Sequence, residues 1–186
     1  MSAGGVQQAQ ADLARTRTAA MEFVRGEAGF AQVTTLDDGG YPVGRTMAAF
    51  LEDDWSIVLV QRRLHRRIEQ WERDRRTLVT WVGEPDAAST NEHPHVFDLG
   101  LLIPRVVMVR GDVSVMPEDR TWFRYQQCMH EHRALGNTRA PVRNRAQAAD
   151  ELVGVHLRPT RVRLEGFGVE AQSFTWSPAT QGESER

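Results

Sequence analysis

The chain runs Phe30-Ala31-Gln32-Val33-Thr34-Thr35-Leu36 into Asp37-Asp38-Gly39-Gly40, and this stretch decides the fold. The first part is rich in β-forming residues, while Asp and Gly tolerate the positive φ angles of a tight hairpin turn. Two more β-rich runs follow, from Tyr41 to Leu51 and from Trp55 to Gln61, and Glu52-Asp53-Asp54 forms the turn between them. The sequence therefore predicts an opening three-stranded antiparallel meander.

Further short strands and a few helices are predicted after the meander. The predicted strands are Leu78–Val82, Arg105–Met116 and Leu152–Phe167, the last bent near Pro159. The predicted helices are Val6–Arg25, Arg62–Arg73, a segment from Pro117 through Met129, and a helical turn at Gln147–Asp150. Consecutive short strands with few helices are typical of a small antiparallel barrel. We expect a mainly β (α+β) fold, a six-stranded antiparallel barrel with flanking helices.

Composition restricts the chemistry. The chain has 186 residues and a net charge of −2, which suits one domain and gives no general attraction to nucleic acid or to an anionic membrane. All 23 basic residues are Arg, so Schiff-base chemistry on a lysine is excluded. Cys128 is the single cysteine, so no intramolecular disulfide can form. No signal peptide and no membrane-spanning apolar run are visible, and we expect a cytoplasmic protein.

Four cations crowd the start of the predicted helix at Arg62–Arg73. They are Arg62, Arg63, Arg66 and Arg67, and Arg45 lies on a neighbouring predicted strand. Cations are unfavourable at a helix N-terminus, which is already positive, and a bound anion would relieve that repulsion. Guanidinium groups with exposed helix amides predict a phosphate site. A solvated basic surface that binds nothing is the alternative.

The order and spacing of several short motifs resemble the pyridoxamine 5′-phosphate oxidase-like, FMN-binding split β-barrel superfamily. The motifs are Arg45-Thr46-Met47-Ala48, Val60-Gln61, His65-Arg66-Arg67, Arg73-Asp74-Arg75-Arg76 and the strand from Arg105 to Gly111. The resemblance implies a split barrel over residues 27–170, preceded by an N-terminal helix over 1–26 and followed by a polar tail over 171–186.

The resemblance also implies a function and a site. It implies an FMN-dependent oxidoreductase that transfers a hydride or electrons to or from a small molecule, with the site between the two subunits of a homodimer. Arg45, Arg66 and Arg67 would contact the cofactor phosphate. The remaining cofactor-binding positions would be Thr46, Met47 and Ala48 along the ring, with Val60 and Gln61 at the ring or ribityl chain. No catalytic acid or base is assigned.

The sequence departs from the family pattern at several positions. Val60-Gln61 replaces an aromatic-Thr pair, His65 replaces Ser, and Arg67 replaces Lys. The family's C-terminal substrate arginine is missing around Gly166, which argues against pyridoxine phosphate as substrate. These departures leave open a deazaflavin coenzyme, whose acidic tail the loop arginines 139, 143 and 145 would hold. They also leave open haem, with His156 as a candidate ligand, and a sensor without catalysis.

Histidines are spaced poorly for a metal. His93 and His95 flank Pro94 in the predicted loop over 83–104, with no acidic residue or cysteine at a ligand spacing. His130 and His132 lie two apart on a predicted helix and so point to different faces. No metal site is predicted.

Overall fold

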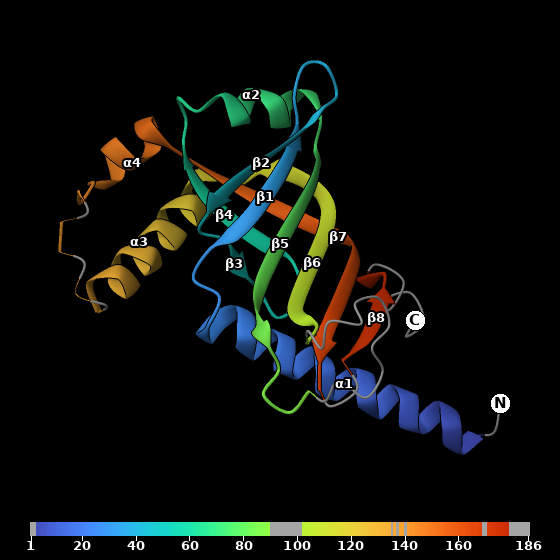
Figure 1. Cartoon of the computed structure of the whole chain (residues 1–186). Helices are drawn as coiled ribbons and strands as arrows, with labels where there is room; N and C mark the ends of the chain where they lie inside the picture. The colour runs from blue at the N-terminus through green and yellow to red at the C-terminus, as the bar shows by residue number, and fades with distance from the viewer. Residues whose placement is uncertain are drawn as a thin grey trace.

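The computed structural model describes residues 3–89, 102–134, 136, 138–139, 141–168 and 171–178. Its centre is an eight-stranded sheet with neighbours in the order β2-β1-β5-β6-β7-β4-β3, and β8 pairs with β7. The strands are β1 (Ala31–Leu36), β2 (Pro42–Met47), β3 (Phe50–Leu51), β4 (Ile57–Arg62), β5 (Arg76–Pro85), β6 (Pro104–Val115), β7 (Leu152–Phe167) and β8 (Gln172–Trp176). All pairs are antiparallel, and the sheet curls into a half-barrel (Figure 1), which confirms the predicted split-barrel class.

The predicted hairpin at residues 30–41 forms as expected. β1 pairs with β2 from Ala31↔Met47 to Leu36↔Pro42. In the turn, an Asp37 side-chain oxygen accepts hydrogen bonds from the backbone N–H groups of Gly39 and Tyr41, at 2.9 Å each. Gly40 has a φ of 79°, a conformation that favours glycine. Local turn chemistry is therefore enough to place this first pair of strands.

The predicted meander is wrong in one respect, because its second strand divides. β2 pairs only with β1, and after Ala48-Ala49 the short β3 pairs instead with β4. β4 then pairs along its whole length with β7, from Ile57↔Leu157 to Arg62↔Leu152. Among the described strands, β2 and β4 share no ladder. We call the junction between these two strands the split.

The long strands β5, β6 and β7 form the back of the half-barrel. β6 pairs with β5 from Arg76↔Asp112 onward and with β7 through a bulge after Arg110, where Gly111 lies opposite Pro159. This bulge agrees with the bend predicted near Pro159. The structure contains the six predicted strands and two more, β3 and β8.

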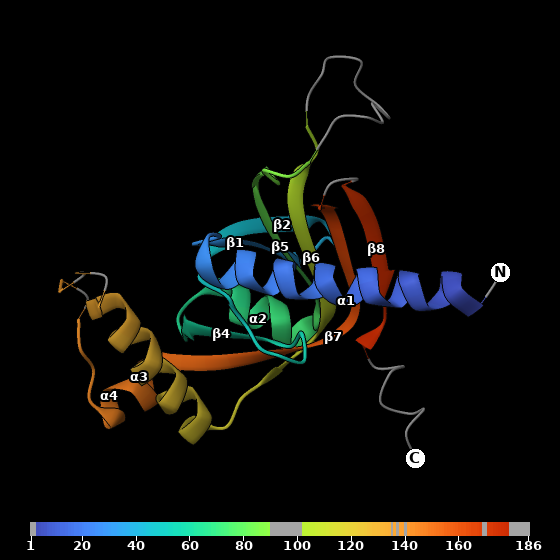
Figure 2. The ribbon, with the colours of Figure 1, turned by 90° about the horizontal axis from the view of Figure 1, so that it is seen from below.

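Four helices flank the sheet. They are α1 (Ala3–Gly26), α2 (Arg66–Arg73), α3 (Glu118–Ala134) and α4 (Arg145–Glu151). Figure 1 shows α1 and α2 at opposite ends of the curled sheet, with α3 and α4 together to one side. Figure 2 shows α1 crossing the end of the sheet and continuing past β8. No helix within the described ranges has the length and hydropathy required to cross a membrane.

The predicted start of α2 is wrong by one turn. The sequence pattern places Arg62 in the helix, whereas Arg62 ends β4 and α2 begins at Arg66, with His65 as its N-cap. The reason is that the ladder with β7 continues to Arg62↔Leu152. Only Arg66 and Arg67 of the four clustered cations therefore lie on the helix.

The segment over 171–186, predicted as a polar tail, contains β8. Phe174 and Trp176 alternate along this strand and pack against the core. The Trp176 ring meets the buried Trp55 ring edge-on, with centroids 5.0 Å apart. Burial of these two aromatic side chains provides the driving force for a strand in an otherwise polar segment.

We predict that Gly111→Ala destabilises the protein. A Cβ at Gly111 would lie 1.9 Å from the carbonyl oxygen of Arg158, so the bulge between β6 and β7 would have to open. A loss of about 2 to 3 kcal/mol in the free energy of unfolding is expected, typical of overpacking. Urea unfolding measures it, with Gly26→Ala as the control, because a Cβ there meets nothing within 4 Å. Equal stability of the two variants would contradict the prediction.

Candidate functional site

The predicted site residues lie on the two strands that flank the split and at the start of α2. Arg45, Thr46 and Met47 are on β2, Ala48 follows it, and Val60 and Gln61 are on β4. Among the described strands, none pairs with the edge of β2 away from β1, and β3 covers β4 only at Ile57 and Val58. The backbone N–H and C=O groups along these open edges can therefore bind a ligand, as at other unpaired strand edges.

The cations at the start of α2 and on β2 are close enough to act on one another. We define the cationic cluster as Arg45, Arg62, His65 and Arg67. Burial and the charge of Arg45 lower the pKa of Arg67. Burial and then the charges of Arg67, Arg62 and Arg45 lower the pKa of His65. The structure thus brings together groups that the sequence placed on three separate segments.

No carboxylate balances these cations. Within the part of the chain that the structure describes, no salt bridge involves Arg45, Arg62, Arg66 or Arg67, whereas Arg73 on the same helix pairs with Asp38. Grouped like charges destabilise a fold unless an anion joins them. The cluster therefore has the electrostatics of an anion-binding site.

A short chain of hydrogen bonds holds Arg45 in place. Its guanidinium donates to the hydroxyl of Thr35 on β1 at 3.1 Å, and that hydroxyl donates to the side-chain carbonyl of Gln70 on α2 at 2.9 Å. Thr35 and Gln70 are buried. α2 is itself anchored by Trp71, whose indole N–H donates to Thr77 on β5 at 2.9 Å. Arg45 and the helix are thus fixed relative to each other.

Arg67 is half-buried and poorly satisfied. Its guanidinium reaches the sulfur of Met47 at 3.5 Å, and a thioether is a weak acceptor. Arg66 is exposed beside it. The His65 side chain does not cap the first turn of α2, so the helix end lacks a side-chain acceptor. Both features leave donors available to an external anion.

The remaining predicted positions differ in their surroundings. Gln61 is only 9% exposed, and its side chain makes no hydrogen bond to another described residue. Its amide could therefore bind a ligand. The Thr46 hydroxyl donates to the Gln32 side chain at 3.1 Å, and Ala48 and Val60 are half-buried. Of these positions, Gln61 thus has the side-chain amide that is free to meet a ligand.

Arg63 belongs to the arginine run of the sequence, but in the structure it binds the end of α4. Its guanidinium donates to the carbonyl oxygens of Ala149, Asp150 and Leu152 at 3.1 to 3.3 Å, and its backbone N–H donates to Glu151. These carbonyls lie at the C-terminal end of α4, which favours a cation. Arg63 is therefore removed from the set of free cations.

The loop arginines are mostly engaged as well. Arg143 pairs with Glu151 at 2.6 Å, and Arg145 pairs with Asp119. The backbone N–H of Arg143 also donates to the hydroxyl of Tyr125 at 2.9 Å. Arg139 remains exposed. Two of the three loop cations thus hold α3 and α4 together.

Comparison of the sequence with protein-family models and with curated proteins finds no match. Among solved structures, a heme binding protein from Mycobacterium smegmatis is similar at TM-score 0.60 and 15% identity, over 90% of this chain and 60% of that one. A protein from Clostridium acetobutylicum related to general stress protein 26 of B. subtilis, of the pyridoxinephosphate oxidase family, is similar at TM-score 0.53 and 13% identity, over 88% and 94% of the two chains. This chain has the split β-barrel fold of the pyridoxamine 5′-phosphate oxidase-like proteins. A NimC/NimA family protein from Clostridium acetobutylicum is also similar to this chain, at TM-score 0.52 and 13% identity, over 87% of this chain and 93% of that one.

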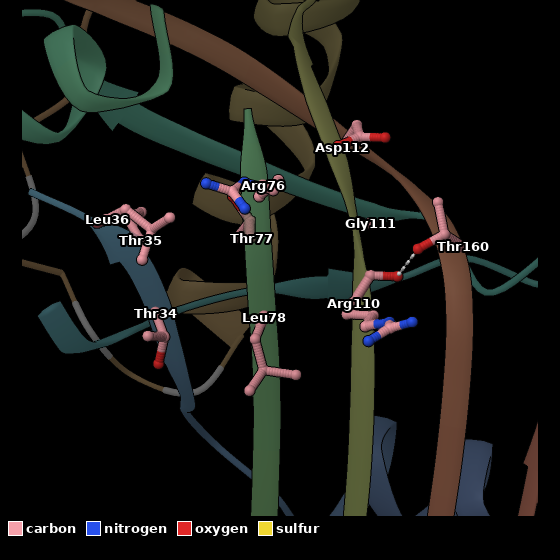
Figure 3. Close-up of a pocket in the computed structure, with 10 residues that line it drawn as sticks. All are labelled: Thr34, Thr35, Leu36, Arg76, Thr77, Leu78, Arg110, Gly111, Asp112 and Thr160. Carbon is pink, nitrogen blue, oxygen red and sulfur yellow. Dashed lines mark hydrogen bonds between the residues drawn. The ribbon is translucent and has the colours of Figure 1, made fainter. Parts of the chain in front are cut away.

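None of the predicted cofactor-binding residues lines either of two hollows on the described part of the split barrel, although Thr35, which holds Arg45, lines the first. One of about 400 Å³ lies on the strands β1, β5, β6 and β7 (Figure 3), where the Thr160 hydroxyl donates to the carbonyl oxygen of Arg110 at 3.2 Å. The other, of about 650 Å³, lies between α3 and the β3–β4 turn, and the half-buried His156 lines it with Phe123 and Arg124. His93 and His95 fall outside the described residues. Within those residues, no three His, Cys, Asp or Glu side chains form a metal site.

We predict that Arg63→Ala destabilises the split barrel more than Arg62→Ala does. The first substitution removes hydrogen bonds to three carbonyl groups at the end of α4, and the second removes none among the described residues. A loss of about 1 to 2 kcal/mol is expected for Arg63→Ala and close to zero for Arg62→Ala. Urea unfolding measures both free energies. The assignment of Arg63 to the fold fails if the two variants unfold alike.

Proposed function

We propose that the split barrel binds FMN in the split, with its phosphate held by Arg45, Arg66 and Arg67. Thr46, Met47 and Ala48 then lie along the flavin ring, and Val60 and Gln61 meet the ring or the ribityl chain. The observation that carries this proposal is the cationic cluster, which no carboxylate balances within the described residues. A phosphate dianion is the ligand that such a cluster fits best.

The rest of the site also fits a phosphate-bearing flavin. Gln61 offers an unpartnered amide to a polar ring edge, and the open edges of β2 and β4 offer backbone donors and acceptors. Met47 and Val60 provide apolar surface beside them. A mostly apolar platform with a few placed polar groups is typical of cofactor sites.

We further propose that the protein is an oxidoreductase acting on a small molecule. Bound FMN would supply hydride or electron transfer, and the protein would hold the phosphate and orient the ring. The guanidinium of Arg45, fixed by Thr35, would also favour negative charge nearby. Steady turnover with a reductant and an acceptor distinguishes this enzyme from a flavin-binding sensor.

We propose that the split barrel works as a homodimer with its cofactor site at the subunit interface. The strand face around the hollow in Figure 3 supports this, because the half-buried Leu36 and Leu78 line a hollow whose rim carries Arg76 and Arg110. Apolar side chains beside cations on a sheet face suit burial against a second copy.

Two other cofactors remain as alternatives. The engagement of Arg143 and Arg145 in ion pairs disfavours a deazaflavin coenzyme, because it leaves Arg139 as the free cation of that loop among the described residues. Haem is the second candidate, favoured by the hollow that His156 lines together with Arg120 and Arg124. Arg120 could pair with a haem carboxylate, whereas Arg124 already pairs with Glu52 at 3.0 Å, and His156 would be the candidate ligand of the iron.

The absorbance spectrum of the purified protein, with the released cofactor identified by mass, tests the cofactor. We expect flavin bands and released FMN. The double variant Arg66→Ala, Arg67→Ala should bind FMN at least about 100-fold more weakly, because it loses two charge-assisted contacts. Arg73→Ala is the matched control on the same helix, since Arg73 already pairs with Asp38. A Soret band, or a protein that ignores added FMN, would reject the proposal.

Light scattering after gel filtration tests the dimer. We expect twice the mass of one chain for the wild type and a single-chain mass for Leu78→Glu, because the new carboxylate would be buried unpaired in the interface. Val142→Glu is the control, at a position that is 60% exposed and away from that sheet face. A monomeric wild type, or a dimeric Leu78→Glu, would place the interface elsewhere or exclude it.

A further inference from the structure

His65 stands at the junction between β4 and α2, inside the cationic cluster. Its backbone is extended, with φ −81° and ψ 129°, as suits an N-cap. Its ring does not cap the helix, and it makes no hydrogen bond to another described residue. Both ring nitrogens are therefore available to a group from outside the chain, which is unusual for a residue in a helix-capping position.

The charged groups that affect the pKa of His65 are all cations. Arg45 acts from β2, Arg62 from β4 and Arg67 from the same helix. The carboxylates of α2, Glu69 and Glu72, are exposed, as are Asp150 and Glu151 of α4, and Glu151 pairs with Arg143. Burial and these cations hold the pKa of His65 below its usual value. The ring is therefore neutral near pH 7 when no anion is bound.

A bound phosphate reverses this balance. Two negative charges among the cations would offset the repulsion that keeps the ring neutral, and a protonated ring offers a second N–H donor. We propose that His65 takes up a proton when a phosphate monoester binds in the cationic cluster, and so acts as a further, proton-dependent ligand of the phosphate. This inference rests on the proposed function, since it concerns the same site.

The sign of the pH dependence follows from linkage. A group whose pKa is higher in the complex than in the free protein strengthens binding at low pH, and this contribution is lost as the pH rises through the pKa of the complex. The contribution of His65 to the affinity for FMN should therefore fall as the pH rises from 6 to 8. One coupled proton changes an affinity by up to about tenfold per pH unit.

Calorimetry of FMN binding in two buffers with different ionisation enthalpies tests the proposal. At one pH, the difference in heat gives the number of protons taken up per FMN bound. The phosphate of FMN also titrates in this range, so its own proton exchange is the background against which the variants must be compared. We therefore compare the wild type with His65→Gln, and use His130→Gln on the exposed face of α3 as the control.

We expect the wild type and His130→Gln to take up more protons than His65→Gln, by a fraction of a proton that approaches one between pH 6 and 8. Relative to that of His65→Gln, their affinity should also decrease as the pH rises. Equal uptake by wild type and His65→Gln, with FMN bound to both, would overturn the inference and leave the proposed function standing. A wild type that does not bind FMN would overturn both. If His65→Gln fails to fold, His65→Ser replaces it, because a serine hydroxyl caps a helix well.

Discussion

The lack of a shared ladder between β2 and β4 is the constraint on which the rest of the site depends. The two strands are separated in sequence only by Ala48-Ala49, the short β3 and one turn, yet β2 is one edge of the described sheet and β4 lies at its other end, beside β3. Open strand edges are a liability that proteins usually cover. Here α2 covers one end of the split, because the Thr35–Gln70 and Trp71–Thr77 hydrogen bonds fix it against β1 and β5. A ligand along the two edges would complete the coverage.

The arginines of this lysine-free chain divide into two groups that only the fold separates. Arg63, Arg143 and Arg145 hold α4 and α3 through carbonyl groups and carboxylates. The charge of Arg45 acts on Arg67, and within the described residues neither pairs with a carboxylate. The contacts of the first group stabilise the fold, whereas the repulsion in the second destabilises it, and a bound anion would relieve that repulsion. Such stored repulsion is common where a protein must bind charge.

The sequence could predict what depends on neighbours along the chain. The Asp37–Gly40 hairpin was predictable because its turn chemistry is local. An antiparallel barrel was predictable from the run of short strands, and its split form from the family resemblance. The division of β2 from β3 was not, since the β-rich pattern continues through Ala48-Ala49. The start of α2 was misplaced because Arg62 pairs with Leu152, ninety positions later in the chain. For the same reason, the sequence could not separate Arg63 from its neighbours or find the unpartnered amide of Gln61. The alternation of Phe174 and Trp176 was the one signal that could have revealed β8.

The packing of β8 links the C-terminal part of this chain to the strand β4. Trp176 packs edge-on against Trp55, and Trp55 immediately precedes the strand that carries Val60 and Gln61. Trimming the chain at residue 170, as the polar composition of its C-terminus invites, would strip the cover from Trp55 and from the entrance to β4. Protease cleavage near the C-terminus would then act at a distance, because a loosened β4 would shift one wall of the split.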